Sequence, residues 1–185
     1  MSHYQRIACL CTEAVDTLYA LGAEEHIAGI SGFTVHPPRA REEKPKISGF
    51  SSGKIERILS VEPDLVVGYS SLQAELCKDL SKAGVEVLLF NHRTISGILR
   101  MVRVLAALVE KEKQGNLLEI TLHTRLDVAR TQAKLWDLAG WRRPVVYFEE
   151  WHEPLTTGIG WVSELIQLAG GVDALSRAPL LLSDP

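Results

Sequence analysis

Three histidines stand in loops that follow three different predicted strands: His36, His92 and His152. A neutral imidazole ligates metals such as zinc or haem iron, so side chains converging from three strand ends could form a metal site. No short ligand spacing links them, however, and a single loop histidine is more often a polar surface residue. The sequence therefore leaves a metal centre and a plain surface role both open.

The usual signatures of catalysis are absent from the sequence. There is no glycine-rich phosphate loop, no dinucleotide-binding fingerprint and no Gly-x-Ser-x-Gly elbow. The acidic loop at residues 149–153 could bind a cation, but carboxylates on a solvated loop usually do not. Cys9, Cys11 and Cys77 lack the spacing of a zinc site. We therefore predict no catalytic residues and no metal ligands, and we expect a binding protein rather than an enzyme.

Four short apolar segments would position these loops. They are Arg6–Leu10, Ile27–Ile30, Asp64–Gly68 and Val85–Phe90. Helical patterns between the first two and between the last two predict parallel strands joined by right-handed crossovers. In open parallel sheets, ligands sit just beyond the carboxyl ends of the strands. Those ends are followed here by Cys11–Thr12, Ser31–Phe33, Tyr69–Ser71 and Asn91–Arg93. We expect these residues to form a ligand-facing rim.

The longest helical pattern runs from Thr94 to Ala139, with Gly115 as the expected interruption. It predicts either one kinked helix or two, and its length far exceeds the average of about 11–12 residues. Such an element suggests a strut between two lobes. Beyond it, Pro144–Phe148 is the expected strand, Trp161–Ala169 the expected helix, and Leu180–Leu182 the one further candidate strand.

We therefore predict an α/β fold with two parallel-sheet lobes joined by a long rigid helix. Residues 1–93 would form the N-terminal lobe, residues 94–139 the connecting helix, and residues 140–185 a partial C-terminal lobe. The second lobe looks incomplete, because one or two strands and one helix cannot cover both faces of a sheet.

Composition excludes several partners. The net charge is −3 and no basic stripe appears, so we expect no nucleic acid. No apolar run approaches the length of a membrane-spanning helix. The charged segment Arg39–Lys46 is expected to be a solvated surface excursion. Residues 1–6 contain no apolar signal region, so the chain as written would be cytoplasmic, or periplasmic or cell-surface if an export signal was removed.

Several short motifs follow one another along the chain. They are Arg6–Leu10, Tyr19–Gly22, Ile27–Ser31, Pro37–Pro38, Ile55–Ile58, Glu62–Val67, Ala83–Val87, Pro154–Gly158 and Glu164–Gly171. In this order they resemble the substrate-binding proteins of ABC importers for cobalamin and iron-siderophores, over nearly the whole chain. Cobalamin-binding members that lack a signal peptide are the most similar. The resemblance implies two lobes joined by a rigid helix.

The resemblance also implies a ligand held between the lobes by aromatic side chains and a few polar groups. The matching ligand-binding positions are Cys11, Thr12, Phe33, His36, Phe50, Trp151 and His152. Phe50 stands six residues before Glu56, where the cobalamin binders place a stacking tryptophan. The implied ligand is a cobalamin-like corrinoid, with an iron-siderophore or haem as the alternative, and no covalent cofactor is implied.

A membrane permease of the ABC type is the implied partner. The family docks arginines of the transporter with one acidic residue per lobe, and Glu56 matches in the first lobe. Its second-lobe counterpart is expected beyond residue 185. Two other functions stay open: a metal-binding protein or enzyme that uses His and Glu residues of the same cleft, and a structural subunit that forms a homodimer through the incomplete C-terminal lobe.

Overall fold

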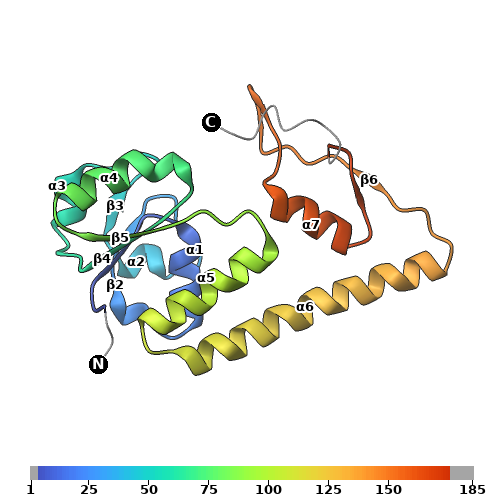
Figure 1. The fold of residues 1–185 in the computed structure, drawn as a ribbon, viewed down its shortest axis with the longest axis horizontal. Helices are drawn as coiled ribbons and strands as arrows, with labels where there is room; N and C mark the ends of the chain where they lie inside the picture. The colour runs from blue at the N-terminus through green and yellow to red at the C-terminus, as the bar shows by residue number, and fades with distance from the viewer. Residues whose placement is uncertain (1–3, 176–185) are drawn as a thin grey trace. The chain divides into compact units, whose positions relative to one another are not determined.

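The computed structural model of the chain describes residues 4–175 and divides into two compact units. Unit 1 comprises Met1–His92 and Arg100–Leu118, and unit 2 comprises Arg93–Leu99 and Glu119–Pro185. Figure 1 follows the chain through the two units.

Unit 1 is built on a five-stranded parallel sheet with the strand order β3-β2-β1-β4-β5. The strands are β1 (Ile7–Cys9), β2 (Ile27–Ser31), β3 (Lys46–Ser48), β4 (Leu65–Tyr69) and β5 (Glu86–Phe90). Every residue of β1 and β4 is buried, since a central parallel strand is covered on both faces. The predicted α/β class and all four predicted strands are confirmed.

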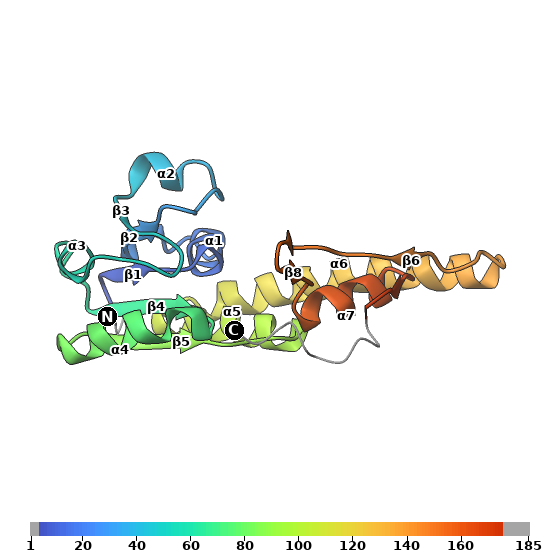
Figure 2. The ribbon, with the colours of Figure 1, turned by 90° about the horizontal axis from the view of Figure 1, so that it is seen from above.

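Helices supply the rest of the unit 1 core. α3 (Ile55–Leu59) and α4 (Ala74–Lys82) pack on one face of the sheet, and α4 lies alongside β5 in Figure 1 and Figure 2. The buried cluster on this face contains Ala8, Leu10, Ile47, Ile58, Val66, Leu76 and Leu80. Side chains alternate along a strand, so Ile7 and Cys9 point to the other face. α1 (Thr12–Ala20) buries Val15 and Leu18 outside this cluster.

Two glycines end helices of unit 1 as the sequence predicts. Gly22 and Gly84 have positive φ angles of 64° and 89°, which a glycine adopts without steric cost. After α1, the Gly22 N–H donates to Tyr19 O (3.1 Å) and the Ala23 N–H to Leu18 O (2.9 Å). These bonds satisfy the last carbonyls of the helix and turn the chain towards β2 through the 3₁₀ turn η1 (Glu24–His26).

Most residues of Arg39–Lys46 are exposed, as expected of a solvated surface excursion, but the segment at residues 39–48 also has regular structure. It contains the short helix α2 (Ala40–Glu43) and the edge strand β3 (Lys46–Ser48). Ile47 is buried against Gly29, where an added Cβ would come within 2.7 Å of the Ile47 side chain. A three-residue strand with Lys46 exposed at the sheet edge has too short a pattern to be recognised from sequence.

The long helical pattern forms two helices, α5 (Ile95–Leu108) and α6 (Glu112–Leu138). The break lies at residues 109–111, where Glu110 has a φ of 55°, and the prediction of Gly115 as the interruption is wrong. Gly115 lies inside α6, where an added Cβ would stand 2.5 Å from Ala106 Cβ of α5. This glycine therefore allows the two helices to approach each other closely. The connecting role of this segment stays a prediction.

Unit 2 contains short strands and one further helix. β6 (Val145–Val146) pairs in parallel with β9 (Val172–Asp173), and β7 (Trp151–His152) pairs antiparallel with β8 (Leu155–Thr156). α7 (Gly160–Leu168) confirms the helix predicted over 161–169. The strand predicted over 144–148 is only two residues long, and the Leu180–Leu182 prediction lies outside the described residues.

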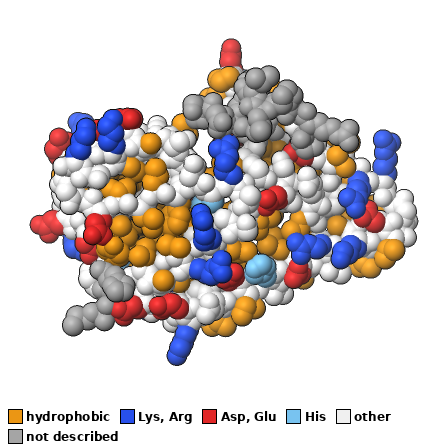
Figure 3. All heavy atoms as spheres, viewed as in Figure 1, with side chains coloured by type: hydrophobic (Ala, Val, Ile, Leu, Met, Phe, Trp, Pro, Cys, Tyr) orange, Lys and Arg blue, Asp and Glu red, His pale blue; other side chains and the backbone are white. Residues whose placement is uncertain are grey.

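Large apolar side chains of unit 2 are exposed on and near its parallel strand pair. Trp141, Val145 and Tyr147 are 70%, 68% and 54% exposed. Along α6, Figure 3 shows acidic and basic side chains interspersed rather than a stripe of one sign. Among residues 4–175, no helix has the length and apolar character needed to cross a bilayer.

Candidate ligand-binding site

Two phenylalanines form the most exposed aromatic surface of unit 1. Phe33 follows β2 and Phe50 follows β3, so both stand beyond the carboxyl ends of neighbouring strands. Their ring centroids are 6.5 Å apart with an interplanar angle of 76°, an edge-to-face pair. Phe33 is 63% exposed and Phe50 38% exposed. The structure thus brings together two predicted ligand-binding residues, Phe33 from the predicted rim and Phe50 from the resemblance.

Hydrogen bonds from the side chains of Ser31 and Arg41 and from the main chain fix the turn that carries Phe33. The buried hydroxyl of Ser31 donates to Gly49 O (3.1 Å) and accepts from the Phe33 N–H (3.3 Å). The Gly32 N–H donates to Ser48 O (2.8 Å). Arg41 donates from one guanidinium nitrogen to Gly32 O (3.0 Å) and to Thr34 O (2.5 Å). The two aromatic loops are therefore joined to each other as well as to the sheet.

Cys11 and Thr12 lie where β1 passes into α1. Cys11 is buried, and burial, aided by Glu13 and Cys9, raises the pKa of its thiol well above the ordinary value. Thr12 is half-buried and its hydroxyl lies 3.4 Å from a Glu13 carboxylate oxygen. A buried thiol offers a ligand little surface, so Thr12 is the more accessible residue of this predicted pair.

His36 and Glu56 are both exposed. His36 lies on the loop that follows Phe33, and Glu56 lies in the first turn of α3. Neither side chain has a described hydrogen bond or ion pair. Their predicted roles, in ligand binding for His36 and in transporter docking for Glu56, stay predictions, and the exposure of both side chains is compatible with them.

His92 is not a rim residue. It is buried, and its ring lies 4.6 Å from the Tyr69 ring, whose hydroxyl donates to His92 O (3.0 Å). Burial lowers the pKa of His92; Glu13 opposes this shift and Arg100 adds to it. Its Nδ1 atom has no hydrogen-bond partner among the described residues. His92 therefore packs inside unit 1, which does not favour the possibility that it joins His36 and His152 in a metal site.

Trp151 and His152 form the aromatic surface of unit 2. They are the two residues of β7, and their rings stack with centroids 5.7 Å apart. The indole N–H of Trp151 donates to Glu153 O (2.9 Å), which holds the ring on the hairpin while 60% of the residue stays exposed. In the neighbouring acidic loop, Glu149 accepts from the Tyr147 hydroxyl (2.5 Å) and raises the pKa of that tyrosine.

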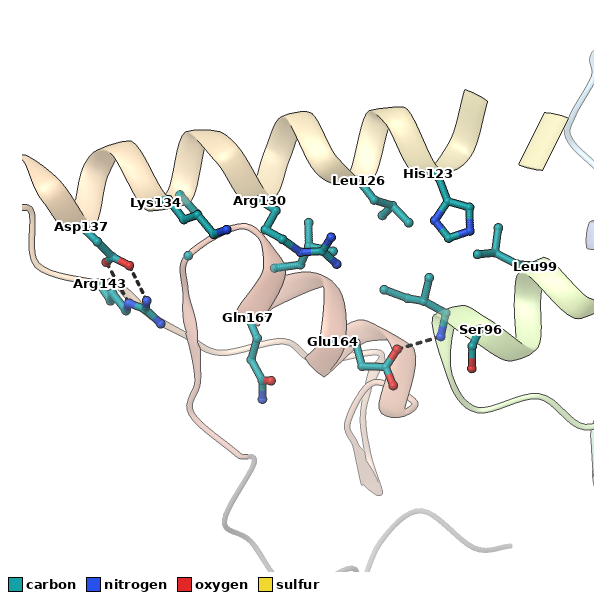
Figure 4. Close-up of a pocket in the computed structure, with 14 residues that line it drawn as sticks. Ser96, Leu99, His123, Leu126, Arg130, Lys134, Asp137, Arg143, Glu164 and Gln167 are labelled. Atoms are coloured by element: carbon teal, nitrogen blue, oxygen red, sulfur yellow. Dashed lines mark hydrogen bonds and ion pairs between the residues drawn. The ribbon is translucent and has the colours of Figure 1, made fainter. Parts of the chain in front are cut away.

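A hollow of about 540 Å³ lies within unit 2, between the first turn of α5, α6 and α7 (Figure 4). Its apolar lining consists of Ile95, Leu99, Leu126, Ala133 and Leu168. Figure 4 shows Arg130 and Lys134 extending from α6, and Glu164 of α7 accepting the Ile95 N–H at 2.8 Å. No predicted ligand-binding residue lines this hollow, so it is separate from the predicted site.

Metal ligands are not gathered anywhere in the part of the chain that the structure describes. No group of three or more His, Cys, Asp or Glu side chains there could hold a metal ion. The described geometry therefore gives the metal-centre interpretation no support. What it does provide is an aromatic surface on each unit.

A match along nearly the whole chain identifies its family. Residues 7–184 match the family described as periplasmic binding protein. The chain belongs to this family.

Curated proteins are similar to the chain along most of its length. The vitamin B12-binding protein of Vibrio campbellii is 25% identical over 177 residues, which are 94% of this chain and 62% of that protein. The vitamin B12-binding protein of Salmonella typhi is 28% identical over 169 residues, 89% of this chain and 61% of that protein. The chain thus spans about three fifths of the length of these relatives.

Solved structures of the family have the same fold. The periplasmic vitamin B12-binding protein BtuF of Vibrio cholerae superposes with a TM-score of 0.74 at 25% identity, covering 92% of this chain and 66% of that one. The apo haem-binding protein RhuT of Roseiflexus sp. RS-1 superposes with a TM-score of 0.77 at 21% identity, covering 98% and 70%. The resemblance inferred from the motifs is confirmed.

Two features of the chain were not predicted from its sequence. The hollow in unit 2 draws its lining from three helices distant in sequence, so no local motif could reveal it. Gln73 is fully buried at the end of the 3₁₀ turn η2 (Ser71–Gln73), although the sequence offers only a polar residue before an amphipathic helix. A glutamine that follows a strand end by four residues was the one available signal.

Proposed function

We propose that the chain is the solute-binding component of an ABC-type importer and that it binds a cobalamin-like corrinoid. The observation that carries the proposal is its family membership together with relatives named vitamin B12-binding proteins at 25–28% identity. The chain spans about three fifths of those relatives, so the ligand and the partner are inferences about the whole protein.

The two aromatic surfaces suit a large flat ligand. Phe33 and Phe50 expose ring area on unit 1, and Trp151 with His152 does so on unit 2. Aromatic side chains offer a wide apolar contact and lose little side-chain entropy when they bind. In this proposal the aromatic side chains of each unit are ligand contacts, and Thr12 and His36 of unit 1 add polar contacts.

Corrinoid is proposed ahead of haem or an iron-siderophore because of sequence similarity. The haem-binding neighbour is 21% identical, a level at which the likeness concerns the fold alone, whereas the curated relatives reach 28%. Binding of this kind needs no covalent chemistry, because specificity comes from the shape of the site and a few polar groups. We accordingly propose no enzymatic step.

An importer permease is the proposed partner, and the periplasm or the cell surface the proposed location. Glu56 is exposed in the first turn of α3, where its carboxylate can meet a basic residue of the permease. An exposed charge of this kind steers the encounter more than it adds affinity. Pairing of two copies is not part of the proposal, since neither the family nor the names of the relatives point to it.

Isothermal titration tests the ligand directly. The purified chain is titrated with cyanocobalamin, cobinamide, haemin and a ferric siderophore, and we expect heat of binding from the corrinoids. Phe50→Ala should weaken corrinoid binding about tenfold, because it removes one ring of the aromatic pair. Leu165→Ala on α7 is the matched control, since Leu165 and Phe50 are both 38% exposed, and it should leave affinity unchanged. Binding of haemin alone would reassign the ligand, and heat from none of the four would refute the proposal.

A further inference from the structure

The side chain of Gln73 reaches into the interior of unit 1 from the turn after β4. Ser70 has a φ of 71°, and its side chain accepts a hydrogen bond from the Leu72 N–H as the chain reverses. The Gln73 N–H donates to Ser70 O (3.1 Å), which completes the turn. The amide group of Gln73 is thereby directed away from solvent, and the residue is 0% exposed.

This amide forms hydrogen bonds to three separate main-chain segments. Its Nε2 group donates to Leu10 O at the end of β1 (3.1 Å) and to Phe50 O in the loop after β3 (2.6 Å). Its Oε1 atom accepts from the Tyr69 N–H at the end of β4 (3.0 Å). Both amide protons are used, so a neutral carboxamide is the side chain that suits two carbonyls and one N–H here.

The sheet leaves space for this amide at Gly68. A Cβ atom added at Gly68 would stand 2.7 Å from Gln73 Oε1, closer than real contacts allow. Gly68 is the one glycine in β4, whose other residues are apolar or aromatic. A strand glycine often marks such a close approach by another group. The absence of a side chain at Gly68 therefore leaves the space that the amide of Gln73 occupies.

The loop that carries Phe50 needs fixing because of its composition. Residues 49–53 read Gly-Phe-Ser-Ser-Gly, and glycine has the largest backbone freedom to lose on ordering. Gln73 holds the carbonyl of Phe50, and Ser31 holds the carbonyl of the preceding Gly49. Ser31 also accepts from the Phe33 N–H, so one hydroxyl contacts both aromatic loops.

We propose that Gln73 is a positioning residue for the ligand: it fixes the Phe50 loop by its carbonyl and so keeps Phe50 edge-to-face with Phe33. Gln73 is buried and acts on the ligand only through Phe50. Ser31 has the same role from the side of β2. This inference rests on the proposed function, since it assigns the buried support of the aromatic surface that the ligand would contact.

Gln73→Met tests this role, because methionine has nearly the same length and cannot make the three hydrogen bonds. We expect amide hydrogen exchange in residues 49–53 to accelerate about tenfold and corrinoid affinity to fall about tenfold, in line with the loss of one or two hydrogen bonds. Leu18→Val, at a buried position of α1 outside the loops, is the control for lost stability. Urea denaturation verifies that the two variants are comparably destabilised, and the control should change neither quantity.

A double-mutant cycle separates positioning from general stability. In the Phe50→Ala background, Gln73→Met should cost no further affinity, because the ring that Gln73 positions is gone. An equal loss of affinity in both backgrounds, or unchanged loop exchange in Gln73→Met, would overturn the proposal. If Gln73→Met does not fold, Ser31→Ala provides the same comparison with a smaller change. If the unaltered chain binds none of the four ligands, the proposed function fails, while the exchange measurement still decides whether Gln73 fixes the loop.

Discussion

Gly115→Ala gives a sharp test of the packing between α5 and α6, because two simple expectations have opposite signs. In an exposed helix interior, replacing glycine by alanine stabilises by about 1 kcal/mol. Here the new Cβ would stand 2.5 Å from Ala106 Cβ and 4.0 Å from Leu21 Cδ2. Ala106 Cβ is bonded directly to the backbone, so the contact is relieved only if the helices separate.

The net effect should be destabilising. Overpacking of this kind costs about 1–3 kcal/mol, which exceeds the gain in helix propensity. We expect Gly115→Ala to lower the free energy of unfolding by about 1 kcal/mol or more. Urea denaturation followed by far-UV circular dichroism measures this change, with the slope of the transition compared between variants.

Ala106→Gly provides the matched background. It removes the methyl group that the new alanine would meet, so in this background Gly115→Ala should stabilise by about 1 kcal/mol. The sign of the Gly115→Ala effect should therefore reverse between the two backgrounds. A stabilising effect in the native background would refute the close approach of α5 and α6, because Gly115 would then behave as an ordinary exposed glycine of a helix interior.

Three further predictions concern buried groups. Burial lowers the pKa of His92 below its ordinary value of 6.5, so the stability that neutral His92 contributes is present above about pH 6.5 and is lost as the pH falls. Urea denaturation between about pH 7 and pH 5 should show a steeper loss of unfolding free energy for the native chain than for His92→Phe. Parallel profiles of the two proteins would contradict this. Burial raises the pKa of Cys9 to about 12 and that of Cys11 well above its ordinary value. Both thiols should therefore react with Ellman's reagent at about pH 8 only after the chain is unfolded in urea. Rapid reaction of either thiol in the native chain would contradict this prediction. Leu105 is fully buried on α5, and Leu105→Ala should lower the free energy of unfolding by about 2–5 kcal/mol, whereas a loss well under 1 kcal/mol would show that α5 packs loosely.

The predictable part of the fold consists of elements whose own sequence contains the reason for their structure. The apolar runs at Ile7–Cys9 and Leu65–Val67 form buried central strands because they carry apolar side chains towards both faces of the sheet. Gly22 and Gly84 end helices because their φ angles are positive. Such signals are local and can be recognised without knowledge of the tertiary contacts.

The missed parts depend on contacts between distant residues. Ile47 of β3 packs against Gly29 of β2, and Gly115 lies where α5 and α6 approach each other, whereas the break between these helices is at Glu110. His92 is buried with its ring 4.6 Å from the tilted ring of Tyr69, a contact that the spacing of the residues does not predict. For the candidate site, a strand end indicated Phe33 and the family resemblance indicated Phe50, but the buried support from Gln73 needed the side-chain geometry.

The discontinuous make-up of unit 1 has a consequence for its biosynthesis. Arg100–Leu118 belongs to unit 1 although seven residues of unit 2, Arg93–Leu99, precede it. During translation the N-terminal sheet must therefore wait for Leu108 to leave the ribosome before all the buried side chains of α5 can join unit 1. A gene fragment cut at residue 93 would yield a polypeptide without that helix, whereas one ending after Leu118 would contain all of unit 1.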